Sequence, residues 1–250
     1  MEHFVNFPGL DLKWFIPPAD LLLPVVAATV VGDDQRQTLR GKLICWSNQW
    51  QRQVGIEARD PVQRSEYMAA NGSAYLLLLL ADQTTETIID AARFIAAAPE
   101  LGFRTILLAV AGTSLSPEAA HLGGDCAMTV VAEEQDQLLH PLKLLLSPTR
   151  MVGYDNADVL EIWKGRIGRV TRVDRVCPEA LHPLLQPHDT AVSGTVLLML
   201  SNAEAALAVA DAIGTLVSIS RAGGDFLWAL NRHGEAVDYV ELVTLAELPR

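Results

Sequence analysis

Basic residues are scarce in this chain of 250 residues. It has 19 Lys and Arg against 30 Asp and Glu, which gives a formal net charge of −11. Nucleic acids and anionic membranes are bound by basic surfaces, so this charge balance argues against both as partners. We attribute the acidic surface to solubility rather than to a function of its own.

Cysteine and long apolar runs are also scarce. Cys45, Cys126 and Cys177 are widely spaced and odd in number, which does not indicate a disulfide framework. Every apolar run is far shorter than the ~20 residues that cross a bilayer. The opening segment MEHFVNFPGLDLKW lacks the basic and apolar regions of a signal peptide. We therefore expect a cytoplasmic protein with reduced thiols and no membrane span.

The stretch from Tyr75 to Val110 predicts the unit around which the chain is organised. Tyr75–Leu80 is an unbroken apolar run, typical of a strand that is covered on both faces. Apolar residues then recur at helical spacing over 88–96, and Thr105–Val110 reads as a second buried strand. This pattern predicts a right-handed βαβ unit. In such units the loop after the first strand, here Ala81–Glu86, is where ligands usually bind.

Around this unit the sequence predicts an α/β first half with a mostly parallel sheet and an α+β second half with a mixed sheet. We place the boundary between residues 1–164, which include an N-terminal arm and a central helix, and residues 165–250. Further strands are predicted at 24–31, 42–46, 126–131, 167–173, 195–200, 217–220, 226–230 and 239–245. Further helices are predicted at 35–40, 114–121, 133–146 and 202–216, with another helix start at 155–164.

The loops that would bind phosphate lack the glycines that let backbone N–H groups approach it closely. The loop after Leu80 has no glycine and carries the acids Asp82 and Glu86. We interpret it as an ordinary turn in which Asp82 or Thr84 caps the next helix. Metal and hydrolase sites find no support either, because His182 and His188 have no cysteine at ligand spacing and no Gly-x-Ser-x-Gly motif occurs.

One acidic pair, Asp155 and Asp158, lies at the start of a predicted helix. A spacing of three residues places both carboxylates on the same side of a helix, where they could position a water or bind a cation. The structural alternative is that Asp155 caps the helix and Asp158 complements its dipole. The spacing alone favours this alternative.

The order of these elements resembles the FtsZ/tubulin superfamily. ELGFRTILLAV is similar to a strand of that family, VGYDNADV resembles its synergy loop, and GTVLLMLSNAEAALAVADAI with the strands after it resembles its second domain. The resemblance covers Val25 to Leu248. It implies an FtsZ/tubulin-like parallel-sheet first domain followed by a smaller α+β domain.

Carried onto this chain, the resemblance implies that Asp155 and Asp158 match the two acids that act on the nucleotide of a neighbouring subunit. Gly153 stands where the family has Asn. The family's glycine-rich phosphate loop would fall on Ala81–Thr87, which has none of its glycines. We therefore predict no cofactor and no metal, with GTP possible but disfavoured. The remnants of the nucleotide loops are Gly32, Asp33, Asp82, Thr84 and Thr85.

The resulting expectation is a divergent FtsZ/tubulin-like protein that acts through contacts with itself or a related subunit, in filament assembly or its regulation. It would bind GTP poorly or not at all; the sequence leans against an enzyme without deciding the question, and an enzyme of this kind would be a GTPase. Two alternatives remain: a GTPase with an altered phosphate loop, and an unrelated α/β enzyme with a small-molecule site between the halves. The absence of a central helix between Glu133 and Lys164 would favour the last.

Overall fold

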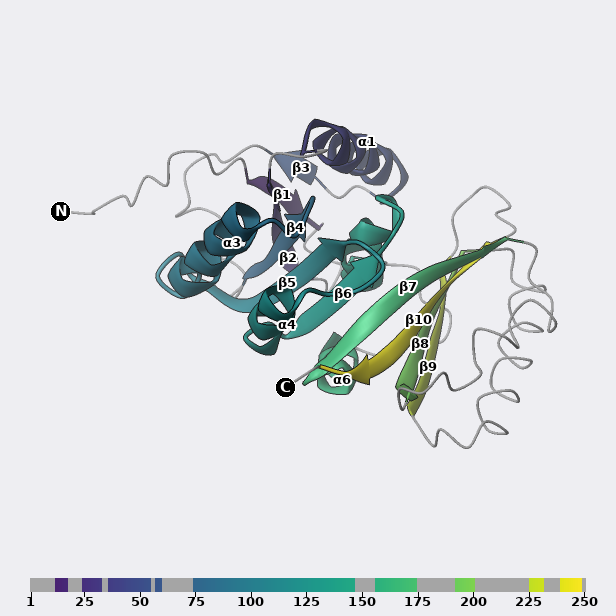
Figure 1. The fold of residues 1–250 in the computed structure, drawn as a ribbon. Coiled ribbons are helices and arrows are strands. Elements are labelled where there is room, and N and C mark those ends of the chain that lie inside the picture. Colours follow the sequence, from purple (N-terminus) through teal and green to yellow (C-terminus); the bar gives the residue numbers. More distant parts are fainter. Residues whose placement is uncertain are drawn as a thin grey trace.

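Ten strands join into one sheet in the part of the chain that the computed structural model describes (Figure 1). This part comprises residues 12–17, 24–32, 36–54, 57–59, 74–146, 156–174, 192–200, 225–231 and 239–248. The strands are β1 (Lys13–Ile16), β2 (Val25–Val31), β3 (Glu57–Arg59), β4 (Ala74–Leu80), β5 (Phe103–Ala111), β6 (Met128–Ala132), β7 (Arg166–Asp174), β8 (Val192–Leu200), β9 (Asp225–Asn231) and β10 (Tyr239–Glu247). Their order across the sheet is β3-β1-β2-β4-β5-β6-β7-β10-β8-β9.

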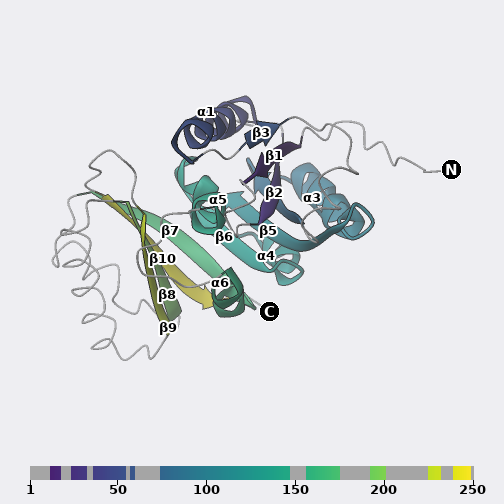
Figure 2. The same cartoon turned by 180° about the vertical axis from the view of Figure 1, so that it is seen from behind.

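Five neighbouring strands, β2, β4, β5, β6 and β7, run parallel and form the centre of the sheet. Helices α1 (Arg36–Val54), α5 (His140–Leu145) and α6 (Asn156–Trp163) lie on one face, and α3 (Thr85–Ala97) and α4 (Pro117–Gly124) on the other (Figures 1 and 2). Alternate residues of β4 divide between the two cores: Leu77 and Leu79 pack under the first group of helices, and Leu76 and Leu78 under the second. This double burial explains why the strand sequence is almost wholly apolar.

The predicted βαβ unit is confirmed. Its strands are β4 and β5, which pair in parallel from Tyr75 opposite Thr105 to Leu80 opposite Val110. The predicted helix between them is α3. The strands predicted at 24–31, 126–131, 167–173, 195–200, 226–230 and 239–245 and the helix at 114–121 are also present, with shifted ends. The elements predicted at 202–216 and 217–220 lie outside the described residues.

The strand predicted at Lys42–Trp46 is wrong, because these residues lie in the middle of α1. Leu39 and Leu43 are both buried in the core, while Ile44 is 42% exposed. Burial of residues four apart with an exposed neighbour is the pattern of a helix packed on a sheet. The short helix predicted at 35–40 is therefore only the first part of a longer one.

The helix predicted at 133–146 is also corrected. The chain instead forms a 3₁₀ helix, η1 (Gln137–Leu139), followed by α5. Pro141 lies at the start of α5 and has no N–H to donate to an earlier turn, so a helix can begin there but not continue through it. The described residues between 133 and 164 thus form η1, α5 and α6 rather than one continuous helix; residues 147–155 lie outside them. The predicted central helix is not found in the described residues, and its absence is the observation named above as favouring an unrelated α/β enzyme.

The second half of the sheet is mixed, as predicted. β10 pairs antiparallel with both β7 and β8, and β8 pairs parallel with β9. Because β7 also pairs with β6, the sheet continues without a break from the first half into the second. Leu248 N donates to Gly165 O at 3.1 Å, which places the end of β10 beside the turn between α6 and β7.

The cysteines are expected to differ sharply in reactivity. Cys45 is exposed on α1, whereas the Cys126 thiol donates to Leu122 O at 3.4 Å. Burial, reinforced by the nearby negative charge of Asp125, raises the pKa of Cys126 to about 12. The reactive form of a thiol is the thiolate, so Cys126 should react very slowly at pH 8 and faster only as the pH approaches its pKa.

Peptide-level mass spectrometry after brief iodoacetamide treatment checks this expectation. Native protein at pH 8 should carry the label on Cys45 and almost none on Cys126, while protein in denaturant should carry it on both. Equal labelling of Cys45 and Cys126 in the native protein would show that Cys126 is accessible and ionised.

Candidate functional site

The carboxyl ends of the parallel strands meet at one edge of the sheet, which is where open α/β sheets bind ligands. The loops at this edge follow β2, β4, β5 and β6. We call them together the carboxyl edge, defined by Gly32, Asp82–Thr84, Gly112–Ser116 and Glu133–Glu134. The predicted remnants of a nucleotide site that are described, Gly32, Asp82, Thr84 and Thr85, lie here or on the first turn of α3.

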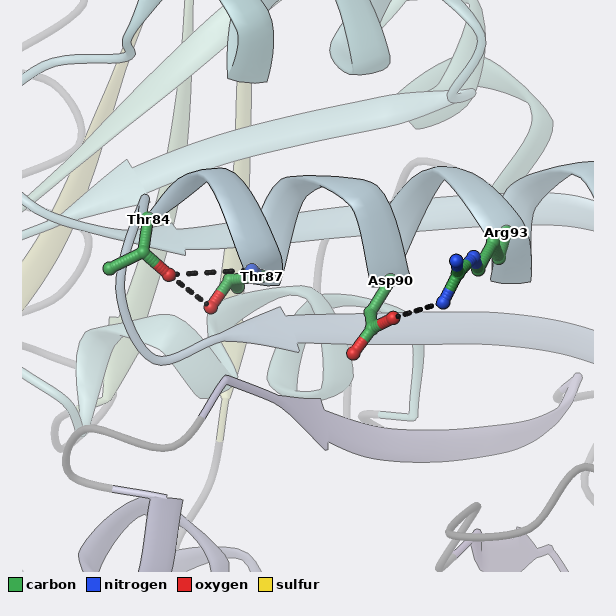
Figure 3. Close-up of polar contacts among 4 residues, drawn as sticks. All are labelled: Thr84, Thr87, Asp90 and Arg93. Atoms are coloured by element: carbon green, nitrogen blue, oxygen red, sulfur yellow. Dashed lines mark hydrogen bonds and ion pairs between the residues drawn. The ribbon is translucent and has the colours of Figure 1, made fainter.

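The N-terminus of α3 is closed by the chain's own side chains. Thr84 is the N-cap, and its Oγ1 accepts from Thr87 N at 3.3 Å (Figure 3). Asp82 Oδ1 accepts from Thr84 N at 3.0 Å and from Thr84 Oγ1 at 2.9 Å, and it also accepts from Thr87 Oγ1. Both residues that the sequence proposed as caps therefore take part. These acceptors occupy N–H groups that would otherwise face a phosphate.

Gly32 brings the end of β2 against this network. A Cβ at this position would lie 2.8 Å from both Asp82 Oδ2 and Thr87 Oγ1, and the residue has φ +102°. A side chain at this position is disfavoured by both the backbone conformation and the limited space. The glycine thus serves close packing of the loops after β2 and β4.

Gln83 closes the neighbouring helix N-terminus in the same way. Its Oε1 accepts from Ser116 N at 2.6 Å, and its Nε2 donates to Ser114 O at 2.8 Å and Ala111 O at 3.2 Å. Ser116 is the N-cap of α4, and its Oγ accepts from Ala119 N at 3.1 Å. One side chain from the loop after β4 therefore holds the whole loop after β5.

Arg169 of β7 holds that loop from its other side. Its Nη2 donates to Thr113 O, and Gly112, with φ +143°, donates its N–H to Ala132 O at 2.9 Å. The loop after β5 is fixed by Gln83 on one flank and by β6 and β7 on the other.

At the start of α3 the carboxyl edge therefore presents the carboxylate of Asp82, whereas a phosphate-binding site would present free backbone N–H donors there. Around α3 the carboxylate of Asp82 occupies the position next to the helix N-terminus, where its charge is stabilised by the helix dipole. A phosphate placed there would be repelled by this carboxylate and would have to displace three hydrogen bonds that it accepts. The arrangement stabilises the start of α3.

Replacing Asp82 with alanine should lower the free energy of unfolding by about 1–3 kcal/mol, because Thr84 N and two hydroxyl groups lose their acceptor. The matched control is Asp90→Ala on the same helix. Asp90 makes only an exposed pair with Arg93 at 3.1 Å (Figure 3), which contributes about 0.2–0.5 kcal/mol. Urea denaturation of both variants measures the difference; equal effects would show that the network around Asp82 contributes nothing.

The other predicted site residues do not gather into a second described site. Asp158 is exposed in the first turn of α6, and Thr85 is exposed at the start of α3. Asp33, Gly153 and Asp155 lie outside the described residues, as do His182 and His188. Within the described ranges, no group of three or more His, Cys, Asp or Glu side chains could hold a metal ion, and no helix has the length and apolarity needed to cross a membrane.

Sequence reasoning missed three residues that organise this edge, Gln83, Thr87 and Arg169. The signal for Gln83 was its place directly after a buried parallel strand, a position that faces the ligand edge. Thr87 lies three residues after the cap Thr84, the spacing at which a cap side chain accepts a backbone N–H. Arg169 is one of the polar residues that alternate along β7, but its bond to Thr113 joins residues 56 apart.

Among known proteins, only the comparison with solved structures found matches to this chain. No family model and no curated protein matches the chain. In fold, the chain resembles solved structures of TubZ, a tubulin/FtsZ-like protein, from Bacillus thuringiensis serovar israelensis. The GTPγS-form protofilament shares 10% identity over 69% of this chain and 60% of TubZ, with TM-score 0.42. The GDP-form protofilaments share 12% identity over 69% of this chain and 61% of TubZ, with TM-score 0.44.

A helical model of the two-stranded TubZ-Bt filament covers 83% of this chain and 64% of TubZ, with 12% identity and TM-score 0.43. The chain thus spans somewhat under two thirds of the TubZ chains that it matches. The likeness is one of fold at low identity, and the function is argued from the residues.

Proposed function

We propose that this chain is a divergent FtsZ/tubulin-like protein that acts through contacts with other protein subunits and does not bind GTP productively. It self-assembles or docks on a related subunit. The observation that carries the proposal is the closed N-terminus of α3, where Asp82 and Thr84 take the place of a phosphate. The absence of glycine from Ala81–Thr87 supports the same conclusion.

The proposed contact face includes α6. Asp158 and Glu161 are exposed on this helix, and its other side is anchored in the core by Val159 and Trp163. A helix that is fixed on one side and acidic on the other can present charge to a partner without unfolding. Asp158 was also the described member of the acidic pair that the sequence singled out.

Sedimentation velocity over a range of protein concentrations, with and without GTP and Mg²⁺, tests the proposal. We expect species larger than the monomer that grow with concentration and do not respond to GTP. Asp158→Lys should reduce their size, whereas Glu118→Lys, the same charge change on α4 of the opposite face, should not. A monomer at every concentration would rule out self-assembly, and assembly only with GTP would contradict the nucleotide-independent mechanism.

The second candidate is a GTPase that uses an altered loop. It predicts magnesium-dependent phosphate release that falls on Asp155→Ala and Asp158→Ala. Exposed Asp158 at a helix start is compatible with it, but the acidic capped loop after β4 opposes it. Phosphate release by the wild-type chain, lost in both variants, would favour this candidate over the first.

A further inference from the structure

A second part of the carboxyl edge is open rather than closed. β6 and β7 pair over only three residues, from Thr129 opposite Ile167 to Val131 opposite Arg169. β6 then ends at Ala132, while β7 continues to Asp174. β6 and β7 therefore no longer pair beyond Val131 and Arg169; we call this divergence the fork and the two strands its arms. Parallel strands that diverge leave a crevice at their carboxyl ends.

The side chain of Gln137 in η1 hydrogen-bonds the backbone of β7 within this fork. With its amide oriented to satisfy both neighbours, its nitrogen donates to Val170 O at 3.2 Å and its oxygen accepts from Arg172 N at 3.1 Å. The side chain is 5% exposed and substitutes for the missing strand partner of β7. The divergence of β6 and β7 is therefore stabilised by specific hydrogen bonds.

A pocket of about 210 Å³ lies in the fork, and we call it the β6–β7 pocket. Its polar lining comes from both arms and from the loop after β5. The polar and charged residues that line it are Thr113, Glu133, Glu134, Gln137, Arg169, Thr171 and Arg172.

Charges of opposite sign line this pocket without pairing with each other. Arg169 is exposed and uses Nη2 to donate to Thr113 O. Glu133 and Glu134 are exposed on the other arm. In the described part of the chain, no ion pair within 4.0 Å joins Arg169 to either glutamate. A guanidinium has five N–H donors, so Arg169 retains donors for an anion, while the two carboxylates attract a cation.

We propose that the β6–β7 pocket binds a small zwitterion, a free amino acid or a similar amino-carboxylate. Arg169 takes the carboxylate and the pair Glu133–Glu134 takes the ammonium group. The pocket is smaller than the ~300–1,000 Å³ of sites for drug-sized ligands, which matches a small ligand. This site is independent of the proposed assembly function, because it involves neither α6 nor the loop after β4.

The test uses the twenty standard amino acids singly, with propionate and propylamine as probes of each charge alone. Saturation-transfer NMR identifies binders and calorimetry gives their affinities. We expect at least one amino acid to bind more tightly than propionate and propylamine. Each lost charge-assisted hydrogen bond should weaken it by about tenfold or more, in Arg169→Ala and in the double variant Glu133→Gln/Glu134→Gln.

Glu118→Gln, an exposed glutamate of α4 that does not line the pocket, is the matched control and should bind like the wild type. Arg169→Ala also removes the hydrogen bond that holds the loop at Thr113, so this variant could fail to fold. In that case the double glutamate variant alone tests the proposal. The proposal is overturned if no amino acid binds or if the glutamate variant binds as tightly as the wild type. It is also overturned if propionate binds as well as the amino acids, which would indicate an anion site, or if GTP displaces the bound amino acid.

Discussion

Replacing Trp163 with alanine is expected to lower the free energy of unfolding by about 3–5 kcal/mol, more than any other single change considered. The side chain is 1% exposed at the end of α6, and its Nε1 donates to Thr129 O on β6 at 3.0 Å. A Cβ added at Gly168 on β7 would lie 2.7 Å from its ring and 2.8 Å from Val243 on β10. The indole thus fills the place where α6, β6, β7 and β10 meet.

Guanidinium denaturation of the wild type, Trp163→Ala and Trp163→Phe measures this effect. The phenylalanine variant keeps much of the ring volume but removes the donor, so it should fall between the other two. A loss below about 1 kcal/mol in Trp163→Ala would mean that α6 does not join the two halves of the sheet as the packing indicates.

Replacing Gly32 with alanine should be the second most damaging change. Its φ of +102° is unfavourable for a residue with a Cβ, and backbone strain of this kind costs of order 1–2 kcal/mol. Crowding against Asp82 Oδ2 and Thr87 Oγ1, each 2.8 Å from the added atom, should cost about 1–3 kcal/mol more.

The control is Gly124→Ala at the end of α4, where an added Cβ meets nothing within 4 Å. Thermal or urea unfolding of the two variants should show a large loss for Gly32→Ala and little change for Gly124→Ala. If the variants were equally stable, the contact between the loop after β2 and the Asp82 network would not be a tight one.

The parallel centre of the fold could be predicted because its signal is local. Strands such as β4 and β5 are short apolar runs between turns, and α3 has apolar residues at helical spacing and a cap at Thr84. The sheet of the second half was predicted from its strand-like segments, of which β7 alternates apolar with polar residues. These features depend on neighbours within about one element.

The errors arose where tertiary packing outweighs local preference. Residues 42–46 contain β-branched and aromatic side chains that favour a strand, but burial of Leu39 and Leu43 against the sheet makes them helical. Residues 133–146 are amphipathic, but they form a turn, η1 and α5 rather than one helix. Pro141 allows a helix to begin but not to continue through it, and the side chain of Gln137 hydrogen-bonds the β7 backbone.

The caps of α3 could be predicted from the sequence, but the long-range contacts of the carboxyl edge could not. Asp82 and Thr84 were recognised as candidate caps, and both accept hydrogen bonds at the start of α3. The expectation that this loop binds no phosphate stays a prediction. The bonds of Gln83 to the loop after β5 join residues 28 to 33 apart, and that of Arg169 joins residues 56 apart. Such pairs follow from the order of strands in the sheet, which the sequence does not reveal directly.

Isothermal titration of the purified chain with GTP and with GDP, in the presence of Mg²⁺, tests the central claim most directly. With Asp82 and Thr84 closing the N-terminus of α3, we expect no binding heat for either nucleotide at micromolar concentrations, and the same result for Asp158→Ala. Micromolar binding of GTP or GDP by the wild-type chain would contradict the claim that the chain does not bind GTP productively.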